Sequence, residues 1–246
     1  MNLLLVEPDE LSPEGLVTLE DGRARHLLGV LRVVPEQAVR VGVVNGALGT
    51  GRVVSVSGHA VTLACTLTDA PLAPRVDLLL AVPRPKVLRR LWAQLAALGV
   101  RRILLTNAAR VERNYFDTHL LEAAGFRPFL IEGLQQARDT RIPDVTVHRQ
   151  FRVLVEDELD QLTGPARRLV ADPSATMRVA DAVRGGETDA GRVLLAVGPE
   201  GGWNAFELAL LATHGFTAVD MGARTLRSDT ACIALLALVH EALRGA

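Results

Sequence analysis

Two short segments in the second half of the chain have the residue types and spacing of a ligand site. In the first, the apolar residues 193–197 lead into the turn Gly-Pro-Glu-Gly-Gly at positions 198–202. Glycine has no Cβ atom, so its backbone can adopt left-handed angles and come close to a bound molecule. A buried strand that ends in such a turn predicts a ligand at its end. For this segment alone, a plain strand-to-helix connection is the alternative.

A second glycine-bearing strand end follows at residues 219–231. There a short apolar run ends at Gly222, and two arginines and a polar helix start come next. Parallel α/β sheets bind ligands outside the carboxyl ends of their strands. We therefore expect the two turns to line one crevice.

Together, the two segments resemble the paired motifs of the RsmE family, the SPOUT-superfamily methyltransferases that modify uracil N3 in 16S rRNA. The second motif reads Met-Gly-x-Arg-x-Leu-Arg-x-Asp-Thr-Ala at positions 221–231. Residues 26–32 (His-Leu-Leu-Gly-Val-Leu-Arg) and the glutamine-rich residues 135–143 are similar to two further family segments. The four matches occur in the family's order and cover most of the chain. The resemblance implies an α/β protein with a C-terminal SPOUT-type parallel domain containing a deep trefoil knot, a PUA-like N-terminal β-barrel and a homodimer.

The resemblance also implies that the two turns bind S-adenosyl-L-methionine. This cofactor carries the reactive methyl group, so the protein mainly positions it. Backbone groups of the glycine turns can face its adenine and ribose, while Met221 and Leu226 supply apolar walls. Residues 171–174 follow another short strand and are a candidate third wall. The residues that we assign to the cofactor are Leu195, Gly198, Gly201, Gly202, Met221, Gly222, Thr225, Leu226 and Thr230.

Methylation at uracil N3 requires the loss of a proton, so a general base or a group that stabilises the uracil anion is expected. Glu200 and Asp229 are the candidate bases, and Arg227 is the candidate stabiliser of charge on the uracil oxygens. Each also has a structural interpretation. Glu200 and Asp229 could bind the N–H groups of helix starts, and Arg227 could pair with either carboxylate. We assign Glu200 and Arg227 to catalysis and favour capping for Asp229.

Basic residues are concentrated in the middle of the chain. Residues 71–150 carry 13 arginines and lysines against 7 acids, a net charge of +6, whereas the segments on either side are negative. Clustered positive charge is the usual footprint of RNA binding, and a target on the Watson–Crick edge must be unpaired or flipped out. The alternatives are a solvated helix face, a strand-end arginine for Arg32 and a salt bridge for Arg141. The candidate contacts to 16S rRNA or the 30S subunit are Arg32, Arg84, Lys86, Arg89, Arg90 and Arg141.

Three places depart from the family pattern. Residues 2–5 are Asn-Leu-Leu-Leu where family members carry arginine and aromatic residues, so no RNA contact is carried over there. Asp229 stands where glutamate is usual, and Arg138-Asp139 replace a small residue and a glycine near the glutamine-rich segment. These departures bear on the roles of single residues rather than on membership of the family.

The elements that must position these residues fall into two parts. Between residues 16 and 67, short β segments are separated by turn dipeptides such as Asn45-Gly46. The expected strands there are 16–19, 38–44, 51–56 and 60–67. The proline-bearing residues 69–74 form a linker, where neither a helix nor a sheet ladder continues. We predict a PUA-like RNA-binding domain at 1–70 and a SPOUT methyltransferase domain at 71–246.

After the linker, strands and helices alternate, which predicts a parallel sheet with both glycine turns at its carboxyl edge. In the first helix the apolar residues share one face and the basic residues lie off it, so the helix should pack on the sheet and present its basic side outward. Asn204 and Glu207 suit the N-cap and third position of a later helix. The expected strands are 77–82, 102–105, 169–171, 193–197 and 216–221, and the expected helices are 85–98, 115–136, 204–214 and 229–243.

Other classes of protein fit the sequence less well. No apolar run is long enough to span a bilayer, and the N-terminus has no basic leader, which predicts a cytoplasmic protein. Cys65 and Cys232 lie far apart in apolar surroundings, so neither a disulfide framework nor a metal site is expected. A non-catalytic RNA-binding assembly factor, or a SPOUT methyltransferase acting on another RNA, is the remaining alternative. A Rossmann-type enzyme is disfavoured because no Gly-x-Gly-x-x-Gly follows the first strand of the α/β part.

Overall fold

The computed structural model of the chain describes residues 2–185 and 191–244. Contacts between Cα atoms divide the chain into two compact units. The first unit consists of Met1–Ala73 and Ile131–Ile142, and the second of Pro74–Leu130 and Pro143–Ala246. The first unit thus includes a segment that the predicted domain 1–70 leaves out. The two-domain division at residues 70 and 71 stays a prediction.

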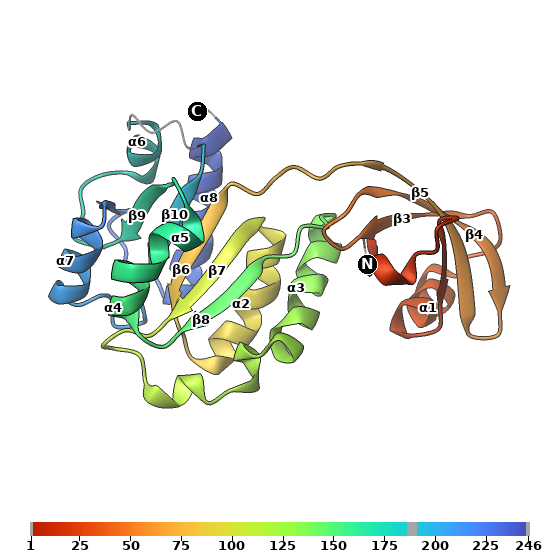
Figure 1. Cartoon of the computed structure of the whole chain (residues 1–246), viewed down its shortest axis with the longest axis horizontal. Coiled ribbons are helices and arrows are strands. Elements are labelled where there is room, and N and C mark those ends of the chain that lie inside the picture. The colour runs from red at the N-terminus through yellow and green to blue at the C-terminus, as the bar shows by residue number, and fades with distance from the viewer. Residues whose placement is uncertain (1, 186–190, 245–246) are drawn as a thin grey trace. The chain divides into compact units, whose positions relative to one another are not determined.

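The first unit is built on a curled, five-stranded sheet (Figure 1). Its strand order is β1-β3-β4-β5-β2, in which β1 and β3 are parallel and the other neighbours are antiparallel. Residues alternate between exposed and buried along β2, so one face of this strand meets the core. The strands are β1 (Leu4–Val6), β2 (Leu16–Leu19), β3 (Ala38–Val43), β4 (Leu48–Ser57) and β5 (Ala60–Asp69). The four strands expected between residues 16 and 67 are confirmed, and β1 is an additional one.

Short helical segments complete the core of this unit. Asp21 caps the first α-helix by accepting a hydrogen bond from the backbone N–H of Arg23 at 2.8 Å. Ala24 and Leu27 then pack into the same apolar core as the strand residues. The helical segments are η1 (Pro8–Glu10), α1 (Gly22–His26) and η2 (Leu27–Leu31).

Residues 131–142 are fastened to this unit by hydrogen bonds. The hydroxyl of Thr140 donates to the carbonyl of Gly46 at 2.6 Å. Asp139 Oδ1 accepts the backbone N–H groups of Thr140, at 2.6 Å, and Arg141, at 3.0 Å. The aspartate that departs from the family pattern therefore shapes the turn that follows the glutamine-rich segment.

The second unit contains a six-stranded sheet in which all neighbouring strands are parallel. Its order is β11-β9-β10-β6-β7-β8. Every residue of β6 and β10 is buried, as expected for central strands covered on both faces. The strands are β6 (Val76–Ala81), β7 (Val100–Thr106), β8 (Asp144–His148), β9 (Arg167–Ala171), β10 (Val193–Val197) and β11 (Phe216–Val219). The predicted parallel α/β architecture is confirmed.

Helices cover both faces of this sheet (Figure 1). On one face α8 contacts both α2 and α6, whereas α4 and α5 lie on the opposite face. Among the helices that the structure describes, none is both long and apolar enough to cross a membrane. The helices are α2 (Pro85–Ala97), α3 (Ala123–Ala137), α4 (Phe151–Val153), η5 (Leu154–Glu158), α5 (Leu159–Thr163), α6 (Val179–Arg184), α7 (Ala205–Thr213) and α8 (Ser228–Arg244).

Two expected elements of this unit have a different extent. The helix expected at 115–136 begins only with α3, after the short turns η3 (Arg113–Phe116) and η4 (His119–Leu121). The hydroxyl of Thr118 accepts the N–H of Leu120 and starts a separate turn there. The strand expected to reach residue 221 ends with β11 at Val219, because Asp220 forms only an isolated bridge with Arg178.

Candidate active site

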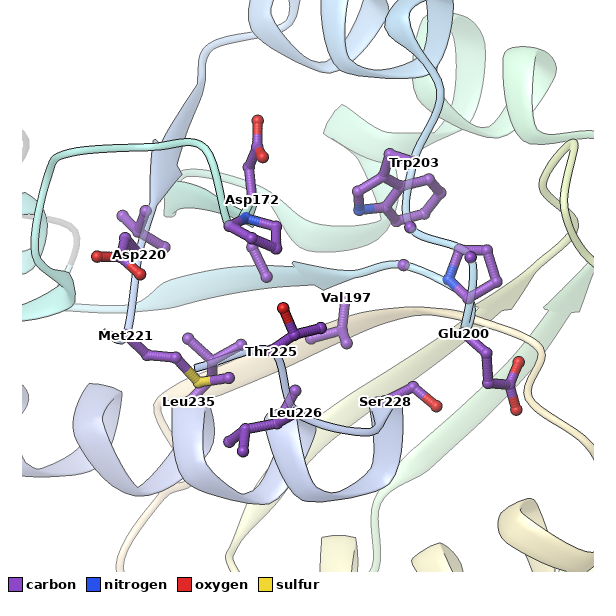
Figure 2. A pocket seen from close by; sticks show the side chains of 18 of the residues that line it. Asp172, Val197, Glu200, Trp203, Asp220, Met221, Thr225, Leu226, Ser228 and Leu235 are labelled. Carbon is purple, nitrogen blue, oxygen red and sulfur yellow. The ribbon is translucent and has the colours of Figure 1, made fainter. Parts of the chain in front are cut away.

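A cavity of about 340 Å³ lies at the carboxyl ends of β9, β10 and β11 (Figure 2). Its lining comes from both glycine-bearing turns, from the loop after β9, from the start of α8 and from one residue beyond β7. The two turns therefore face one cavity, as their positions after parallel strands lead us to expect.

The turn at residues 198–202 has two glycine positions that do not readily accept a side chain. The N–H of Gly202 donates to the carbonyl of Pro199 at 2.8 Å, and Gly202 has a φ of 73°, in the left-handed region that glycine favours. Gly198 lies against the indole of Trp203, since a Cβ atom at this position would lie 3.1 Å from Nε1. A side chain at either position would strain the turn or displace the tryptophan.

Trp203 is a cavity wall with an unsatisfied hydrogen-bond donor. The residue is 7% exposed, and its ring lies 5.3 Å from that of Phe151, centroid to centroid. Its Nε1 is buried and has no acceptor within the part of the chain that the structure describes. In Figure 2 this nitrogen lies on the cavity side of the ring. Because an unpaired buried donor is costly, the site fits a ligand that brings an acceptor.

The second turn and the loop after β9 form the facing walls. Asp220 donates its N–H to the carbonyl of Met177 at 2.9 Å and accepts the N–H of Gly222 on Oδ1 at 2.7 Å. Gly222 has a φ of 121°. The N–H of Asp172 donates to the carbonyl of Val219 at 3.1 Å, so the loop after β9 is held beside the end of β11.

The remaining wall of the cavity is apolar. The side chains of Met221, Leu226 and Leu235 gather on the side formed by α8, and Val197 closes the end of β10 (Figure 2). Thr225 places a hydroxyl among them. A mostly apolar cavity with a few fixed polar groups is typical of small-molecule sites.

Most of the predicted cofactor residues line this cavity. They are Gly198, Gly201, Gly202, Met221, Gly222, Thr225 and Leu226. Leu195 is not among them, because it lies in the interior of β10 and is fully buried. Thr230 is exposed on the first turn of α8 and also lies outside the lining. The cofactor role of each residue stays a prediction.

The two predicted catalytic residues are placed differently. Glu200 lines the cavity and is exposed, and its Oε1 accepts the backbone N–H of Arg84 at 3.4 Å. Arg84 is the N-cap residue of α2, so Glu200 contacts the start of α2 rather than the helix that follows its own turn. Arg227 is exposed just before α8 and lies outside the lining. Their catalytic roles stay predictions.

Asp229 forms an ion pair instead of the cap that we expected. Its Oδ2 lies 2.9 Å from Arg90 Nη2. α8 already begins at Ser228, so Asp229 lies within the first turn of the helix rather than before it. The same pair occupies Arg90, one of the arginines predicted to contact RNA.

The rest of the basic side of α2 faces outward, as predicted. Lys86 and Arg89 are exposed, and the guanidinium of Arg89 lies 5.5 Å from the centroid of the Phe129 ring. Arg84 is also exposed, and a hydrogen bond with Tyr115 raises the pKa of its guanidinium. The contact of Arg84 with Glu200 places this basic helix start beside the rim of the cavity.

The other two RNA candidates belong to the first unit. Arg32 is exposed and ends η2 with a φ of 51°, so the alternative that placed it at a strand end is wrong. Arg141 is partly buried, and its Nε has no hydrogen-bond partner among the described residues. Neither position tests a contact with RNA.

Sequence patterns place Arg110 only in the basic middle of the chain and give Trp203 no role, although both line the cavity. Arg110 lines the cavity although its segment has no glycine turn. Glu207 forms the expected capping box with Asn204, but it is also only 3% exposed and accepts the N–H of Ala109. The position of Arg110 after a strand was an available signal, but only the strand order shows that this strand ends near the cavity.

The thiols and acids of the described residues form no further candidate centre. Both cysteines are free, and burial raises the pKa of Cys232 to about 12. Within the described ranges, no three His, Cys, Asp or Glu side chains are grouped so that they could hold a metal ion.

Comparison with known sequences identifies relatives along nearly the whole chain. Residues 70–240 match the family described as RNA methyltransferase domain. The protein named Ribosomal RNA small subunit methyltransferase E of Treponema pallidum is 32% identical over 245 residues, which cover 97% of this chain and 90% of the relative. Its namesake from Mycobacterium bovis is 29% identical over 244 residues, with coverage of 97% and 92%.

A solved structure shares the fold. The crystal structure of Ribosomal RNA small subunit methyltransferase E from Neisseria gonorrhoeae bound to S-adenosyl methionine superposes with a TM-score of 0.78. It is 23% identical and covers 98% of this chain and 97% of its own. Motifs, fold and relatives agree, and the chain belongs to the RsmE family of RNA methyltransferases.

Proposed function

We propose that this protein methylates N3 of a uridine in 16S rRNA of the small ribosomal subunit, with S-adenosyl-L-methionine as the methyl donor. The names of its relatives support the rRNA substrate, and the Neisseria gonorrhoeae protein was crystallised with this cofactor. The observation that carries the proposal is the cavity between two glycine turns, with the unpaired Nε1 of Trp203 on its wall.

The residues of the cavity fit the cofactor in size and chemistry. A volume of about 340 Å³ lies within the range of small-molecule sites. We infer that Met221, Leu226 and Leu235 hold the adenosine part between apolar side chains. The backbone of the turn at 198–202 and Trp203 Nε1 would supply the polar contacts.

When bound, the cofactor supplies a methyl group already activated by its sulfonium. The residues of the chain must then orient the uracil and remove the N3 proton. Glu200 stands at the rim with only Oε1 engaged by the N–H of Arg84, and we assign it as proton acceptor. Arg227 is exposed outside the cavity lining, so we reassign it from stabilising charge on the uracil oxygens to contacting the RNA.

We further propose that the basic start of α2 guides the RNA to the cavity. Arg84, Lys86 and Arg89 are exposed there, and the contact between Arg84 and Glu200 places them next to the rim. Arg90 is less available because it pairs with Asp229. Contacts to RNA phosphates by these residues would make binding strongly dependent on salt.

We also propose a trefoil knot, a PUA-like barrel and a homodimer. The knot is proposed from the membership of the chain in the family. The curled sheet of the first unit supports a barrel that contacts RNA through Arg32 and Arg141. Leu238, 42% exposed on α8, supports a contact between two copies.

The reaction can be tested by tritiated methyl transfer to 16S rRNA and to 30S subunits that lack the modification. We expect label in one uridine, recovered as 3-methyluridine after digestion to nucleosides. Label on another base or on free tRNA alone would overturn the substrate assignment. If the protein bound no S-adenosyl-L-methionine in calorimetry, the alternative of a non-catalytic RNA-binding factor would be favoured.

The indole nitrogen offers a sharper test of the cofactor site. Trp203→Phe keeps an aromatic ring beside Phe151, but it removes the Nε1 donor together with the five-membered part of the indole that lies against Gly198. We expect the dissociation constant of the cofactor to rise about fivefold, the effect of one neutral hydrogen bond of about 1 kcal/mol. As a matched control, Trp92→Phe removes a buried Nε1 that also lacks a partner but lies outside the cavity lining. Equal affinities in all three proteins would contradict this contact.

A further inference from the structure

Arg110 reaches the glycine turn from a different strand end. It follows β7, and its aliphatic stem covers Gly201, where a Cβ atom would lie 2.8 Å from Arg110 Cδ. Its Nη1 donates a hydrogen bond to the carbonyl of Gly201. Gly201 must therefore be small to leave room for Arg110, because its own φ lies outside the left-handed region.

The loop that carries Arg110 is fixed to the same turn by a buried carboxylate. Glu207 accepts the N–H of Ala109 on Oε1 at 2.7 Å and the N–H of Asn204 on Oε2 at 2.8 Å. The consecutive residues Ala109 and Arg110 are thus held to the two ends of residues 201–204. A guanidinium fixed in this way needs little reorganisation, which is the condition for effective charge stabilisation.

The fixed guanidinium keeps donors for another partner. A guanidinium carries five N–H groups, and the contact with Gly201 uses one of them. Arg110 is exposed, lines the cavity and forms no ion pair with any residue that the structure describes. Arg224 also lines the cavity, but no hydrogen bond anchors its side chain to the described residues.

We propose that Arg110 contacts the target uracil and stabilises the anion that forms when N3 loses its proton. The role rests on the proposed function. Loss of the proton spreads negative charge over the two carbonyl oxygens that flank N3, and a guanidinium stays protonated while it donates to them. The proton passes to the carboxylate of Glu200. The N3 electron pair then forms the bond to the methyl carbon, and the electrons of the broken S–C bond remain on sulfur.

The test compares uridine with 5-fluorouridine in reconstituted 30S subunits, because fluorine makes N3 more acidic. The variants are Arg110→Ala and Arg110→Lys. Arg113→Ala is the matched control, since it removes an exposed arginine of the same region that lies outside the cavity lining. Single-turnover methyl transfer is measured from pH 6 to 9, and calorimetry gives the cofactor affinity.

With uridine, Arg110→Ala should lower the rate at neutral pH about 100-fold, the usual effect of losing one charge-stabilising donor. The rise of the rate with pH should move to higher pH, because the uracil anion is less stabilised. With 5-fluorouridine, the variant should regain about tenfold for each unit by which the N3 pKa falls. Arg110→Lys should keep part of the rate, and Arg113→Ala should give the wild-type ratio of the two substrates.

Equal loss on both substrates would overturn the proposal, since it would indicate a phosphate contact or a purely structural role. A rise in the cofactor dissociation constant as large as the loss of rate would also overturn it and assign Arg110 to the cofactor. Failure of the proposed function shows itself separately. The wild-type enzyme would then place the methyl group on an atom other than uracil N3, before any variant is compared.

Discussion

The two ends of the parallel sheet use arginine in opposite ways. At the amino ends of the strands, Arg101 and Arg192 both reach Asp77, which is 1% exposed. At the carboxyl ends, Arg110 and Arg224 line a cavity without a carboxylate partner among the described residues. At the amino end both arginines reach a carboxylate of the fold, whereas at the carboxyl end neither arginine has one among the described residues.

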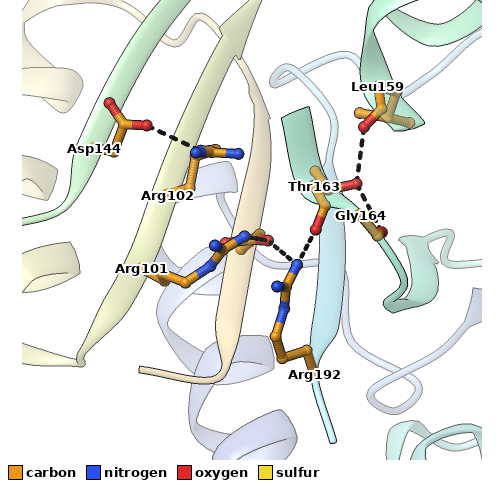
Figure 3. A network of polar contacts seen from close by, with 8 residues as sticks. Arg101, Arg102, Asp144, Leu159, Thr163, Gly164 and Arg192 are labelled. Atoms are coloured by element: carbon orange, nitrogen blue, oxygen red, sulfur yellow. Dashed lines mark hydrogen bonds and ion pairs between the residues drawn. The ribbon is translucent and has the colours of Figure 1, made fainter. Parts of the chain in front are cut away.

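The amino-end network joins four segments that are distant in sequence (Figure 3). Arg101 Nε lies 2.8 Å from Asp77 Oδ1, and hydrogen bonding to this carboxylate raises the pKa of Arg101. Arg192 donates to the carbonyl of Thr163, whose hydroxyl donates to the carbonyl of Leu159 at 2.9 Å. The network thus ties β6, β7 and the approach to β10 to the end of α5.

Structural and functional charges in this chain should respond differently to substitution. A buried ion pair is strongly destabilised when one partner is removed, because the other charge remains without compensation. An unpaired cation beside a cavity contributes little to the stability of the fold. Its removal should instead weaken the binding of a ligand or slow the reaction. Substitutions at the amino ends should therefore change unfolding, and those at the carboxyl ends should change binding and rate.

The largest expected effect is on stability. Asp77→Asn removes the negative charge shared by two arginines whose side chains are 30% and 28% exposed, and it leaves one acceptor oxygen. Because both arginines can still reach water, we expect a loss near the lower limit for buried pairs, about 3 kcal/mol in the free energy of unfolding by urea. Asp144→Asn, which breaks a pair with Arg102 at a carboxylate that is 59% exposed, should cost less than about 1 kcal/mol.

Cofactor affinity should be the same in the wild type and in both aspartate variants, provided that it is measured well below their unfolding transitions. A weaker affinity of folded Asp77→Asn for the cofactor would show that the two ends of the sheet are coupled. It would contradict a purely structural role for Asp77.

A smaller effect is expected at the carboxyl end. In Gly202→Ala, a Cβ atom meets open space apart from Arg110 Nη1 at 4.0 Å, so the cost is mainly that of the φ of 73°. We expect alanine to introduce about 1–2 kcal/mol of strain at this φ, and the turn should shift to relieve it. Because the shifted turn fits the cofactor less well, its dissociation constant in calorimetry should rise about tenfold. Gly99→Ala is the control, because Gly99 has a φ of 71°, its added Cβ atom meets nothing within 4 Å, and it precedes β7, at the amino ends of the strands. Weaker cofactor binding in the control would mean that strain anywhere in the unit reaches the site.

The smallest expected effect depends on pH. Burial lowers the pKa of His240 in α8, so the folded protein favours its neutral form. The unfolded chain binds this proton more readily, and stability should therefore fall as the pH drops through the ordinary histidine pKa of about 6.5. His240→Gln should reduce the loss of stability between pH 7 and pH 5 by less than about 1 kcal/mol, measured by urea unfolding at each pH. An unchanged or steeper pH dependence would contradict this assignment.

Local signals in the sequence predicted much of this fold. β10 and β2 have the expected bounds, since an apolar or alternating run between turn residues specifies a strand by itself. The capping box of Asn204 and Glu207 was predicted for the same reason, because its partners are three residues apart. β8 was not expected, since it is a half-buried edge strand with weak periodicity.

The site was less predictable where it depends on contacts between distant segments. Both glycine turns were predicted from the sequence. Arg110 lines the same cavity only because β7 ends near β10, with β6 between them, and the sequence does not show this strand order. The pairing of Asp229 with Arg90 likewise joins residues from α8 and α2, and no spacing along the chain encodes it. Sequence patterns therefore describe the walls of the cavity better than its charges.

The cavity joins segments that are far apart in the sequence, and this determines the stage of folding at which it is complete. Cavity residues are contributed by segments from Arg110 to Leu235, so the pocket has no complete wall until α8 has folded. Proteins emerge from the ribosome N-terminus first, and their earlier parts fold before the later ones. A chain in which α8 has not yet folded lacks part of the cavity wall, so we expect methyl transfer to begin only after α8 has folded.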